Sequence, residues 1–384
     1  TALVWQRDHW DVSMRDADGV ERVEAFDVVV SGLGQLNRPY VPDLPGLDTF
    51  AGTTFHSARW DDGYPLEGKT LAVIGTGASA IQIVPNIVDR VGRLHVFQRT
   101  APWVTPKPDR AITPTERAVF RAVPAVQKLE RVGVYWLREL LAAGFVWDPR
   151  LLRPLEHLAR RHLARSVQDP VLRAKLTPNY RLGCKRVLPS NDFYPALVRP
   201  HAELVTDRIR EVRPHVIVTD DGVERPVDVI VCATGFEAAE ANAPFEIKGS
   251  DGRDLTDSWR DGLEAYLGTS ISGFPNLFLI VGPNTGLGHT SMVFMMESQF
   301  AYVVSCVKQM RANRWRSVDV RPYVQADYNA EIQGRLAKTL WNSGCASWYR
   351  TRSGRDTTLW PGFTFEFRLR TRAFDPSRYC IATG

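Results

Sequence analysis

The fold is decided by one short stretch, Lys69-Thr70-Leu71-Ala72-Val73-Ile74-Gly75-Thr76-Gly77-Ala78-Ser79-Ala80. It begins as an apolar run typical of a buried parallel strand and continues into an apolar helix. The first glycine permits a tight turn, the second lets the backbone approach a pyrophosphate, and the small Ala80 lets helix and strand pack closely. Free N–H groups at the start of the helix can bind phosphate oxygens. The stretch therefore predicts the dinucleotide-binding turn of a Rossmann fold.

A second apolar strand is expected over residues 94–97, and Gln98-Arg99-Thr100 follows it. An NAD-specific site places Asp or Glu about 20 residues after the glycines, where the carboxylate binds the ribose 2′-hydroxyl. An arginine stands there instead, and a guanidinium suits the 2′-phosphate of NADPH. We therefore predict NADPH as the nucleotide. The predicted contacts are Gly75, Thr76, Gly77, Ala78, Ser79, Ala80, Gln82, Arg99 and Thr100.

Two distant stretches of the chain are similar in sequence. Asp18-Gly19-Val20-Glu21-Arg22 precedes an apolar run that ends at Gly32-Leu33-Gly34. Asp221-Gly222-Val223-Glu224-Arg225 precedes one that ends at Ala233-Thr234-Gly235. Each Asp-Gly pair predicts a hairpin turn, and each valine-rich run predicts a strand of a parallel sheet. Because no glycine-rich turn precedes the first copy, we expect an N-terminally truncated α/β chain with two Rossmann-like dinucleotide-binding domains, the first of them incomplete.

Composition narrows the class of protein. The 384 residues exceed what one hydrophobic core usually serves, so two domains are expected. Hydrophobic residues make up 44% and charged residues 24%, which is typical of a globular protein and excludes a disordered chain. The net charge is +5, but the basic residues are scattered along the chain. We therefore expect no nucleic-acid partner.

The cysteines and apolar runs indicate the compartment. Five cysteines are dispersed along the chain without zinc-ligand spacing, as is typical of reduced thiols in a cytosolic enzyme: Cys184, Cys232, Cys306, Cys345 and Cys380. No apolar run reaches the roughly 20 residues that cross a bilayer, and the start of the chain lacks a secretion signal. We therefore expect a cytoplasmic enzyme without a membrane span and without a metal site.

Residues 50–61 carry a further pattern, Phe50-Ala51-Gly52-Thr53-Thr54-Phe55-His56-Ser57-Ala58-Arg59-Trp60-Asp61. It resembles the fingerprint of Baeyer–Villiger monooxygenases, within the flavoprotein monooxygenases that use FAD and NADPH, and every fixed position matches. The resemblance extends over essentially the whole chain, including residues 183–186, 233–235 and 275–284. It implies an enzyme that uses FAD and NADPH and inserts one oxygen atom from O2 beside a ketone carbonyl. The reaction passes through a C4a-peroxyflavin and gives an ester or lactone. It also implies that an FAD-binding glycine motif lies upstream of Thr1.

The resemblance assigns roles to individual residues. Arg186 corresponds to the active-site arginine of the family, where a permanent cation can stabilise the anionic peroxide and the adduct that follows. Lys185 corresponds to a residue near the NADP phosphate, and Asn284 and Met292 correspond to cofactor contacts on the flavin side. His56 is expected to be a structural residue of a linker and to take no part in the chemistry.

The expected domain order follows from these features. It comprises a first FAD-domain segment (1–48), a fingerprint linker (49–62), an NADPH domain (63–240) with a helical insert (113–181), and a return to the FAD domain with a C-terminal segment (241–384). Helix starts in the insert are indicated by Thr113-Pro114-Thr115-Glu116 and by Asp169-Pro170. A further apolar helix is expected from Met292 to Met310 after a cap at Thr290-Ser291.

Three other functions remain open from the sequence alone. An N- or S-oxygenating flavin monooxygenase uses the same cofactors, but such proteins usually carry tyrosine or phenylalanine at Trp60 and lack the Lys185-Arg186 pair. A flavin-linked disulfide reductase needs a close pair of redox cysteines, which the spacing excludes unless an upstream segment supplies one. An inactive NADPH-binding fragment is the third. The sequence does not identify the ketone, its regiochemistry or the oligomeric state.

Overall fold

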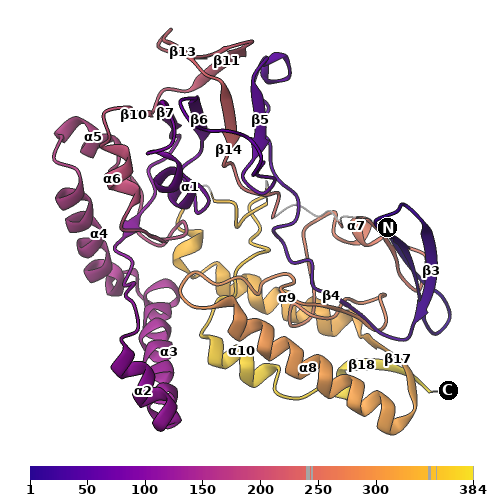
Figure 1. Ribbon diagram of the computed structural model, residues 1–384. Coiled ribbons are helices and arrows are strands. Elements are labelled where there is room, and N and C mark those ends of the chain that lie inside the picture. Colours follow the sequence, from indigo (N-terminus) through magenta and orange to yellow (C-terminus); the bar gives the residue numbers. More distant parts are fainter. Residues whose placement is uncertain (239–242, 244, 345–346, 352, 384) are drawn as a thin grey trace. The chain divides into compact units, whose positions relative to one another are not determined.

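The computed structural model describes residues 1–238, 243, 245–344, 347–351 and 353–383 (Figure 1). By its internal contacts the chain forms two compact units. Unit 1 comprises Thr1–Arg38, Ala125–Pro149 and Glu237–Gly384, and unit 2 comprises Pro39–Pro124 and Arg150–Phe236. Each unit is thus assembled from segments that are far apart in the sequence.

Unit 2 is built on a five-stranded parallel sheet with the strand order β10-β7-β6-β14-β5 (Figure 1). Its strands are β5 (Thr53–His56), β6 (Thr70–Ile74), β7 (Arg93–Phe97), β10 (Ala202–Val205) and β14 (Val229–Cys232). The strands predicted within residues 69–74 and 94–97 are confirmed as β6 and β7.

The described part of unit 2 also contains helices and further short strands. The helices are α1 (Ala80–Ile87), α2 (Pro114–Ala122), α4 (Arg153–Ser166), α5 (Pro170–Lys175) and α6 (Phe193–Leu197). The other strands are β8 (Val104–Thr105), β9 (Leu188–Pro189), β11 (Ile209–Arg213), β12 (Val216–Thr219) and β13 (Glu224–Pro226). Strands β12 and β13 form the antiparallel hairpin predicted around Asp221-Gly222.

Helix α1 packs one apolar face on the sheet. Its buried residues are Ala80, Ile81, Val84 and Ile87, which follow the spacing of a single helix face. They share one apolar cluster with buried residues of the central strands, Leu71, Val73, Leu94, Val96, Val229 and Val231. This packing fixes the start of the helix beside the carboxyl end of β6.

Unit 1 contains a second set of strands and the longest helices. Its strands are β1 (Ala2–Trp5), β2 (Trp10–Arg15), β3 (Glu21–Phe26), β4 (Val29–Ser31), β15 (Glu246–Lys248), β16 (Leu277–Leu279), β17 (Trp315–Val320) and β18 (Tyr379–Thr383). Its helices are α3 (Pro124–Val146), α7 (Leu255–Ser258), α8 (Met292–Asn313), α9 (Pro322–Leu336) and α10 (Thr364–Arg370). Helix α3 begins at the last residue of the preceding unit 2 segment.

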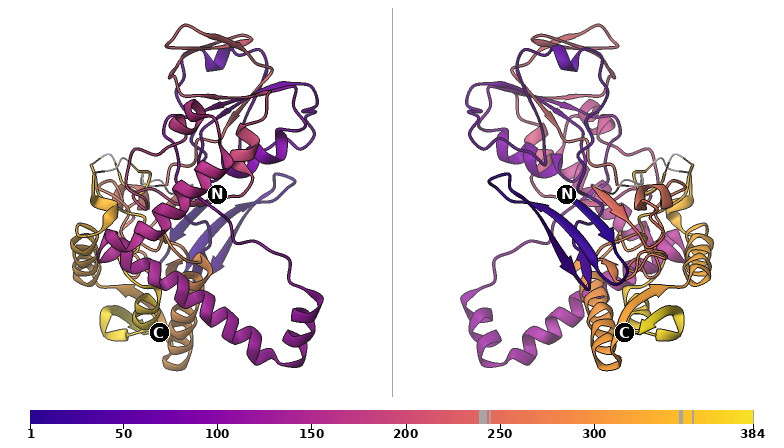
Figure 2. Two further views of the ribbon diagram at one scale, coloured as in Figure 1. Left: turned by 90° about the vertical axis from the view of Figure 1, so that its left-hand side faces the viewer. Right: turned by 90° about the vertical axis from the view of Figure 1, so that its right-hand side faces the viewer.

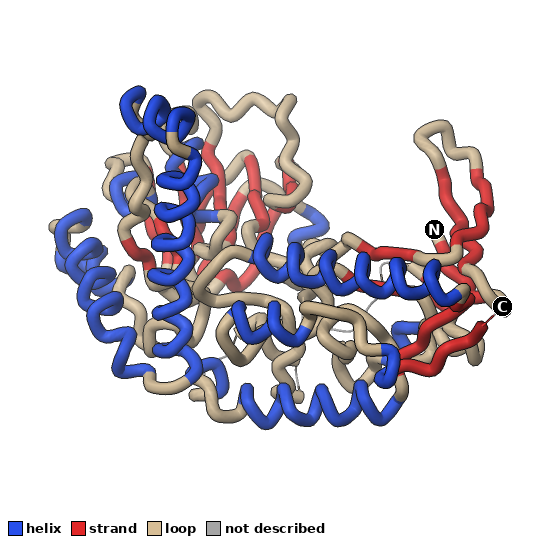
Figure 3. The backbone as a smooth tube through the Cα atoms, turned by 90° about the horizontal axis from the view of Figure 1, so that it is seen from below, coloured by secondary structure: helices blue, strands red, loops and turns tan. Residues whose placement is uncertain are grey.

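The β2–β3 hairpin contains Asp18-Gly19, the first of the two similar stretches of sequence. It projects from the rest of unit 1 (Figures 2 and 3). Every residue of β3 is exposed. The valine-rich run that follows forms β4, which pairs in parallel with β16. The hairpin and the parallel pairing predicted for this copy are therefore confirmed.

The predicted helix starts are confirmed by their caps. Thr113 forms a capping box with Glu116 at the start of α2. The carboxylate of Asp169 accepts hydrogen bonds from the first N–H groups of α5, and the hydroxyl of Ser291 accepts one from Val293 in α8. By contacts, Ala125–Pro149 belongs to unit 1, whereas the helices on either side of it in the sequence belong to unit 2.

The cysteines differ in state. Cys232 and Cys306 are buried free thiols and Cys380 is an exposed one. Burial raises the pKa of Cys232 to about 11 and that of Cys306 to about 12. Cys184 is disulfide-bonded, so the prediction of reduced thiols is wrong for this residue, because sequence spacing does not show which sulfurs folding brings together. Cys345 lies outside the described residues.

No helix within the described residues combines the length and the apolar character that crossing a bilayer requires. No group of three His, Cys, Asp or Glu side chains among the same residues is arranged to hold a metal ion.

Candidate functional site

The carboxyl end of the parallel sheet in unit 2 carries the glycine turn. Ile74, the last residue of β6, lies level with Phe97 of β7 and Cys232 of β14. Gly75 follows with a φ of +111°, and a Cβ at this position would lie 2.5 Å from the carbonyl oxygen of Ala233. Only glycine fits both this backbone conformation and this close approach. The predicted tight turn is therefore confirmed.

The second glycine of the turn faces open space. A Cβ on Gly77 would meet none of the described atoms within 4 Å. The buried Thr76 donates a hydrogen bond from its hydroxyl to the carbonyl of Thr100 at 3.2 Å. This bond ties the turn to the segment that follows β7. Gly77 thus stands in the chain between Thr76, which is tied to that segment, and the start of α1, where a helix can bind an anion.

The remaining predicted contacts surround the first turn of α1. Ser79 precedes the helix and makes no side-chain capping hydrogen bond. Gln82 is exposed, and its amide donates to the carbonyl of Ala78 at 2.8 Å. Ala80 is fully buried against the sheet. The local structure therefore places all of these residues around one turn, and their contact with a nucleotide stays a prediction.

Two cations lie close to each other beyond the end of β7. Arg99 is exposed, and Lys185 is half-buried with its Nζ 5.0 Å from the ring centre of Tyr180. Burial lowers the pKa of Lys185, and the positive charge of Arg99 lowers it further. Neither cation forms an ion pair within the part of the chain that the structure describes. An anion bound between them would relieve their repulsion.

A short parallel pairing explains why these two cations meet. Val104 of β8 pairs with Leu188 of β9. Just before this pair, the indole of Trp103 donates to the carbonyl of Tyr180 at 2.8 Å. The two cations stand a few residues ahead of these strands, on segments that run side by side. The fold therefore joins two predicted cofactor contacts that are far apart in the sequence.

Arg186, the predicted catalytic residue, is exposed and directly follows Lys185. It lies in the segment that leads into β9. Its guanidinium is a cation with five N–H donors in a planar fork. Two neighbouring segments therefore carry three cations, Arg99 on one and Lys185 and Arg186 on the other.

His56 ends the edge strand β5, in register with Cys232. Its Nδ1 accepts a hydrogen bond from the N–H of Ala58 at 3.1 Å, so Nε2 carries the ring hydrogen and donates to the carbonyl of Gly235 at 2.9 Å. Burial lowers the pKa of His56 and so favours this neutral form. Both ring nitrogens are used within unit 2, as expected for a structural residue.

The other fixed residues of the fingerprint also serve the local structure. A Cβ on Gly52 would lie 2.3 Å from the carbonyl oxygen of Asp228. The ring of Trp60 packs edge-on against Phe55, with 4.8 Å between ring centres. Residues 49–62 are expected from the sequence to form a linker, yet Thr53–His56 is the strand β5. Four residues are too few to show a strand period in a sequence.

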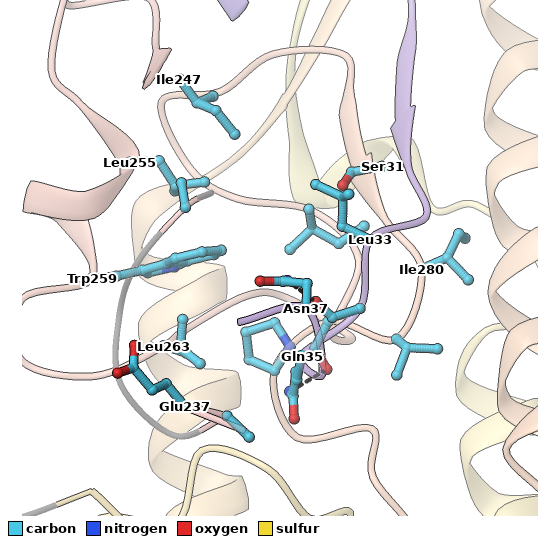
Figure 4. Close-up of a pocket in the computed structure, with 17 residues that line it drawn as sticks. Ser31, Leu33, Gln35, Asn37, Glu237, Ile247, Leu255, Trp259, Leu263 and Ile280 are labelled. Atoms are coloured by element: carbon cyan, nitrogen blue, oxygen red, sulfur yellow. Dashed lines mark hydrogen bonds between the residues drawn. The ribbon is translucent and has the colours of Figure 1, made fainter. Parts of the chain in front are cut away.

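Unit 1 has a pocket at the carboxyl ends of β4 and β16 (Figure 4). The amide of Gln35, after β4, donates to the carbonyl of Gly282, after β16, at 3.1 Å and joins the two loops. The residues that line the pocket are Ser31, Leu33, Gly34, Gln35, Asn37, Glu237, Ala238, Ala243, Ile247, Leu255, Trp259, Leu263, Leu279, Ile280, Val281, Gly282 and Pro283. In open parallel sheets, ligands bind in the crevice beyond the carboxyl ends of the strands. This pocket is therefore a candidate for a second cofactor site.

Asn284 and Met292 lie after this pocket in the chain. Asn284 is buried with a φ of +54°, and its amide donates to the carbonyls of Asp356 and Leu359 at 2.9 and 3.1 Å. Met292 is the half-buried first residue of α8. Neither belongs to the residues that line the pocket, and their contact with a flavin stays a prediction.

Few of the residues that line the pocket could be predicted from the sequence. Gln35 and Asn37 come one and three residues after Gly32-Leu33-Gly34, and that glycine-containing strand ending is the only local signal. Trp259 comes from a distant segment without a recognisable motif. Its place in the pocket depends on the packing of unit 1 and could not be predicted from the sequence.

Comparison with known proteins gives consistent matches. A family model described as flavin-binding monooxygenase-like matches residues 5–245. A Baeyer–Villiger monooxygenase of Pseudomonas aeruginosa is 48% identical over 99% of this chain and 72% of its own length. One of Streptomyces coelicolor is 46% identical over 97% of this chain and again 72% of its own length. The chain thus spans about three quarters of these relatives.

The solved structures agree. The structure of cyclohexanone monooxygenase from Rhodococcus sp. Phi1 bound to NADP+ matches with a TM-score of 0.86. The match covers all of this chain and 80% of that one, at 25% sequence identity. The α/β fold predicted from the sequence is therefore confirmed.

Proposed function

The chain belongs to the flavin-binding monooxygenase-like family and, within it, to the Baeyer–Villiger monooxygenases, and on this premise we propose that it oxidises a ketone with NADPH and O2. It is a flavin-dependent monooxygenase with FAD and NADP as cofactors. The proposed substrate is a small-molecule ketone, and the product is the ester or lactone with one oxygen inserted beside the carbonyl.

One observation carries the nucleotide assignment. The open glycine turn at Gly77 and the two neighbouring cations, Arg99 and Lys185, lie on adjoining segments of unit 2. The turn suits a diphosphate, because the start of α1 and the absence of a side chain leave room for it. The cations suit a 2′-phosphate, because their repulsion is relieved by a bound dianion. The residues present therefore fit NADPH.

The pocket of unit 1 fits the second nucleotide. It lies beyond the carboxyl ends of the parallel pair β4 and β16, with glycines at Gly34 and Gly282 and an apolar wall around Trp259. We assign FAD to this pocket and the FAD-domain role to unit 1, with unit 2 as the NADPH domain. Flavin, when bound and reduced by NADPH, supplies the activation of O2.

The residues of this chain have separate tasks in that reaction. Arg99 and Lys185 hold the 2′-phosphate of NADPH, and the glycine turn holds its diphosphate. Arg186 supplies a permanent positive charge that stabilises the oxyanion formed when the ketone carbonyl is attacked. His56 holds the end of β5 on Gly235 and does not exchange protons with the substrate.

The test uses the full chain with FAD, NADPH and a panel of cyclic, linear and aryl ketones. The expected result is oxidation of NADPH coupled to an ester or lactone from at least one ketone. A sulfide and a tertiary amine serve as comparison substrates. Oxygenation of these two without any ester from the ketones would replace the proposal with N- or S-oxygenation.

A further inference from the structure

A buried hydrogen-bond network around the Glu139 carboxylate joins three distant parts of unit 1. Glu139 of α3 and His289 lie 3.2 Å apart between Oε1 and Nε2, and each side chain is 1% exposed. The carboxylate also accepts hydrogen bonds from Thr364, the first residue of α10, through its N–H at 2.9 Å and its hydroxyl at 2.7 Å. The hydroxyl of Tyr135 then donates to that of Thr364 at 3.1 Å.

The donor set fixes the protonation state of the carboxylate. Burial raises the pKa of Glu139, but the hydrogen bonds from His289 and Thr364 outweigh it and hold the pKa below its usual range. Because an ionised carboxylate only accepts hydrogen bonds, Nε2 of His289 must carry its hydrogen. Removing one partner of such a pair leaves the other charge or dipole buried and unpaired, which is costly. The network is thus a rigid connection.

The connection ends in the chain segment that follows the proposed flavin pocket. His289 lies in the loop between Pro283, which lines the pocket, and Ser291, which caps α8. Helix α3 also contacts the first turn of α8 directly. The ring of Tyr135 stacks on that of Phe294 with 5.0 Å between ring centres. Helix α3 therefore holds both the loop and the helix start that follow the pocket.

We propose that Glu139 is a positioning residue that, through His289, fixes residues 284–292 for flavin binding. The proposal rests on the assignment of FAD to the pocket of unit 1. The contacts of Glu139 and His289 described above all lie within unit 1. Their loss is therefore expected to affect flavin and not NADPH.

The experiment measures backbone hydrogen exchange, FAD affinity and NADPH affinity of the full chain and four variants. Glu139→Gln and His289→Ala each remove a charge-assisted hydrogen bond, so exchange over residues 287–293 and the FAD Kd are expected to rise by about tenfold. His289→Gln keeps an N–H that can reach the carboxylate and is expected to restore the FAD Kd to within about threefold of the unaltered chain. Glu130→Gln, an exposed position on the same helix, is the matched control.

Several outcomes overturn the proposal. Exchange over residues 287–293 that is unchanged from Glu130→Gln would do so, and so would an unchanged FAD Kd or the lack of rescue by His289→Gln. If Glu139→Gln fails to fold, the hydrogen exchange and the FAD Kd of His289→Ala and His289→Gln decide whether the proposal holds. If the unaltered chain binds NADPH but no flavin, the proposed function fails, whereas the exchange measurement still decides whether Glu139 fixes the loop.

Discussion

Two residues of this chain, Arg99 and Lys185, are proposed to determine which nucleotide it prefers. Arg99 and Lys185 are two like charges that the fold holds near each other beside an open turn. Such an arrangement is unfavourable without an anion and becomes favourable with one. At the residue scale, the nucleotide preference therefore depends on charges outside the glycine motif.

Replacement of Arg99 tests this directly. A charge-assisted contact contributes about 1.5–3 kcal/mol, so Arg99→Ala is expected to weaken NADPH binding by roughly 10- to 150-fold and to change NADH binding little. Titration with both nucleotides measures this, with Arg117→Ala on the exposed face of α2 as the control. Equal losses for NADPH and NADH would contradict the 2′-phosphate assignment.

Arg186 belongs to the same scale but to the chemical step. Because its charge is assigned to the oxyanion of the substrate, Arg186→Ala is expected to abolish ester formation while NADPH oxidation continues in part. Product analysis and NADPH absorbance, followed in the same reaction, separate the two. An undiminished ester yield would remove Arg186 from the mechanism.

Asp319 allows a test of stability against pH. Burial raises its pKa to about 6 against an ordinary 3.8, although the N–H of Gly273 donates to it at 3.0 Å. The folded chain thus binds this proton more tightly, and the stability gained below pH 4 is lost as the pH rises through 6. Asp319→Asn is expected to stabilise the protein by about 3 kcal/mol at pH 8 and not at pH 4.

Denaturant unfolding at the two pH values checks this expectation. Asp327→Asn, at an exposed position, provides the comparison. A stabilisation of Asp319→Asn that is the same at both pH values would show that the buried charge is not the cause.

At the scale of elements, the β6–α1 unit combines two glycines with different roles. Gly75 has a positive φ and approaches a backbone carbonyl, whereas Gly77 faces open space. The first is needed for the turn to fold, and the second for a ligand to approach. The strand and helix on either side hold both in place through the buried cluster of unit 2.

The two alanine variants are expected to separate these roles. Gly75→Ala should lower the free energy of unfolding by about 1–3 kcal/mol because of backbone strain. Gly77→Ala should leave stability within about 0.5 kcal/mol and weaken NADPH binding by at least about tenfold. Thermal unfolding and nucleotide titration of both variants provide the measurements. A stable Gly75→Ala, or a Gly77→Ala that binds NADPH normally, would contradict the assignment.

At the scale of the whole molecule, the sequence predicts what is locally encoded. The glycine turn, both Asp-Gly hairpins and the caps at Thr113, Asp169 and Ser291 follow from neighbouring residues, and all are confirmed. The strand β5 is too short to show a period. Other features depend on residues that only the fold brings together, such as the pair Glu139–His289 or Trp259 in its pocket. No local pattern encodes such pairs.

The central claim is that unit 2 holds NADPH through its glycine turn and the cations beside it. The most direct test is the pair of dissociation constants of NADPH and NADH for the unaltered full chain, measured by titration at one ionic strength. The account predicts that NADPH binds at least about tenfold more tightly, because only NADPH carries the 2′-phosphate. Equal dissociation constants, or tighter binding of NADH, would contradict it.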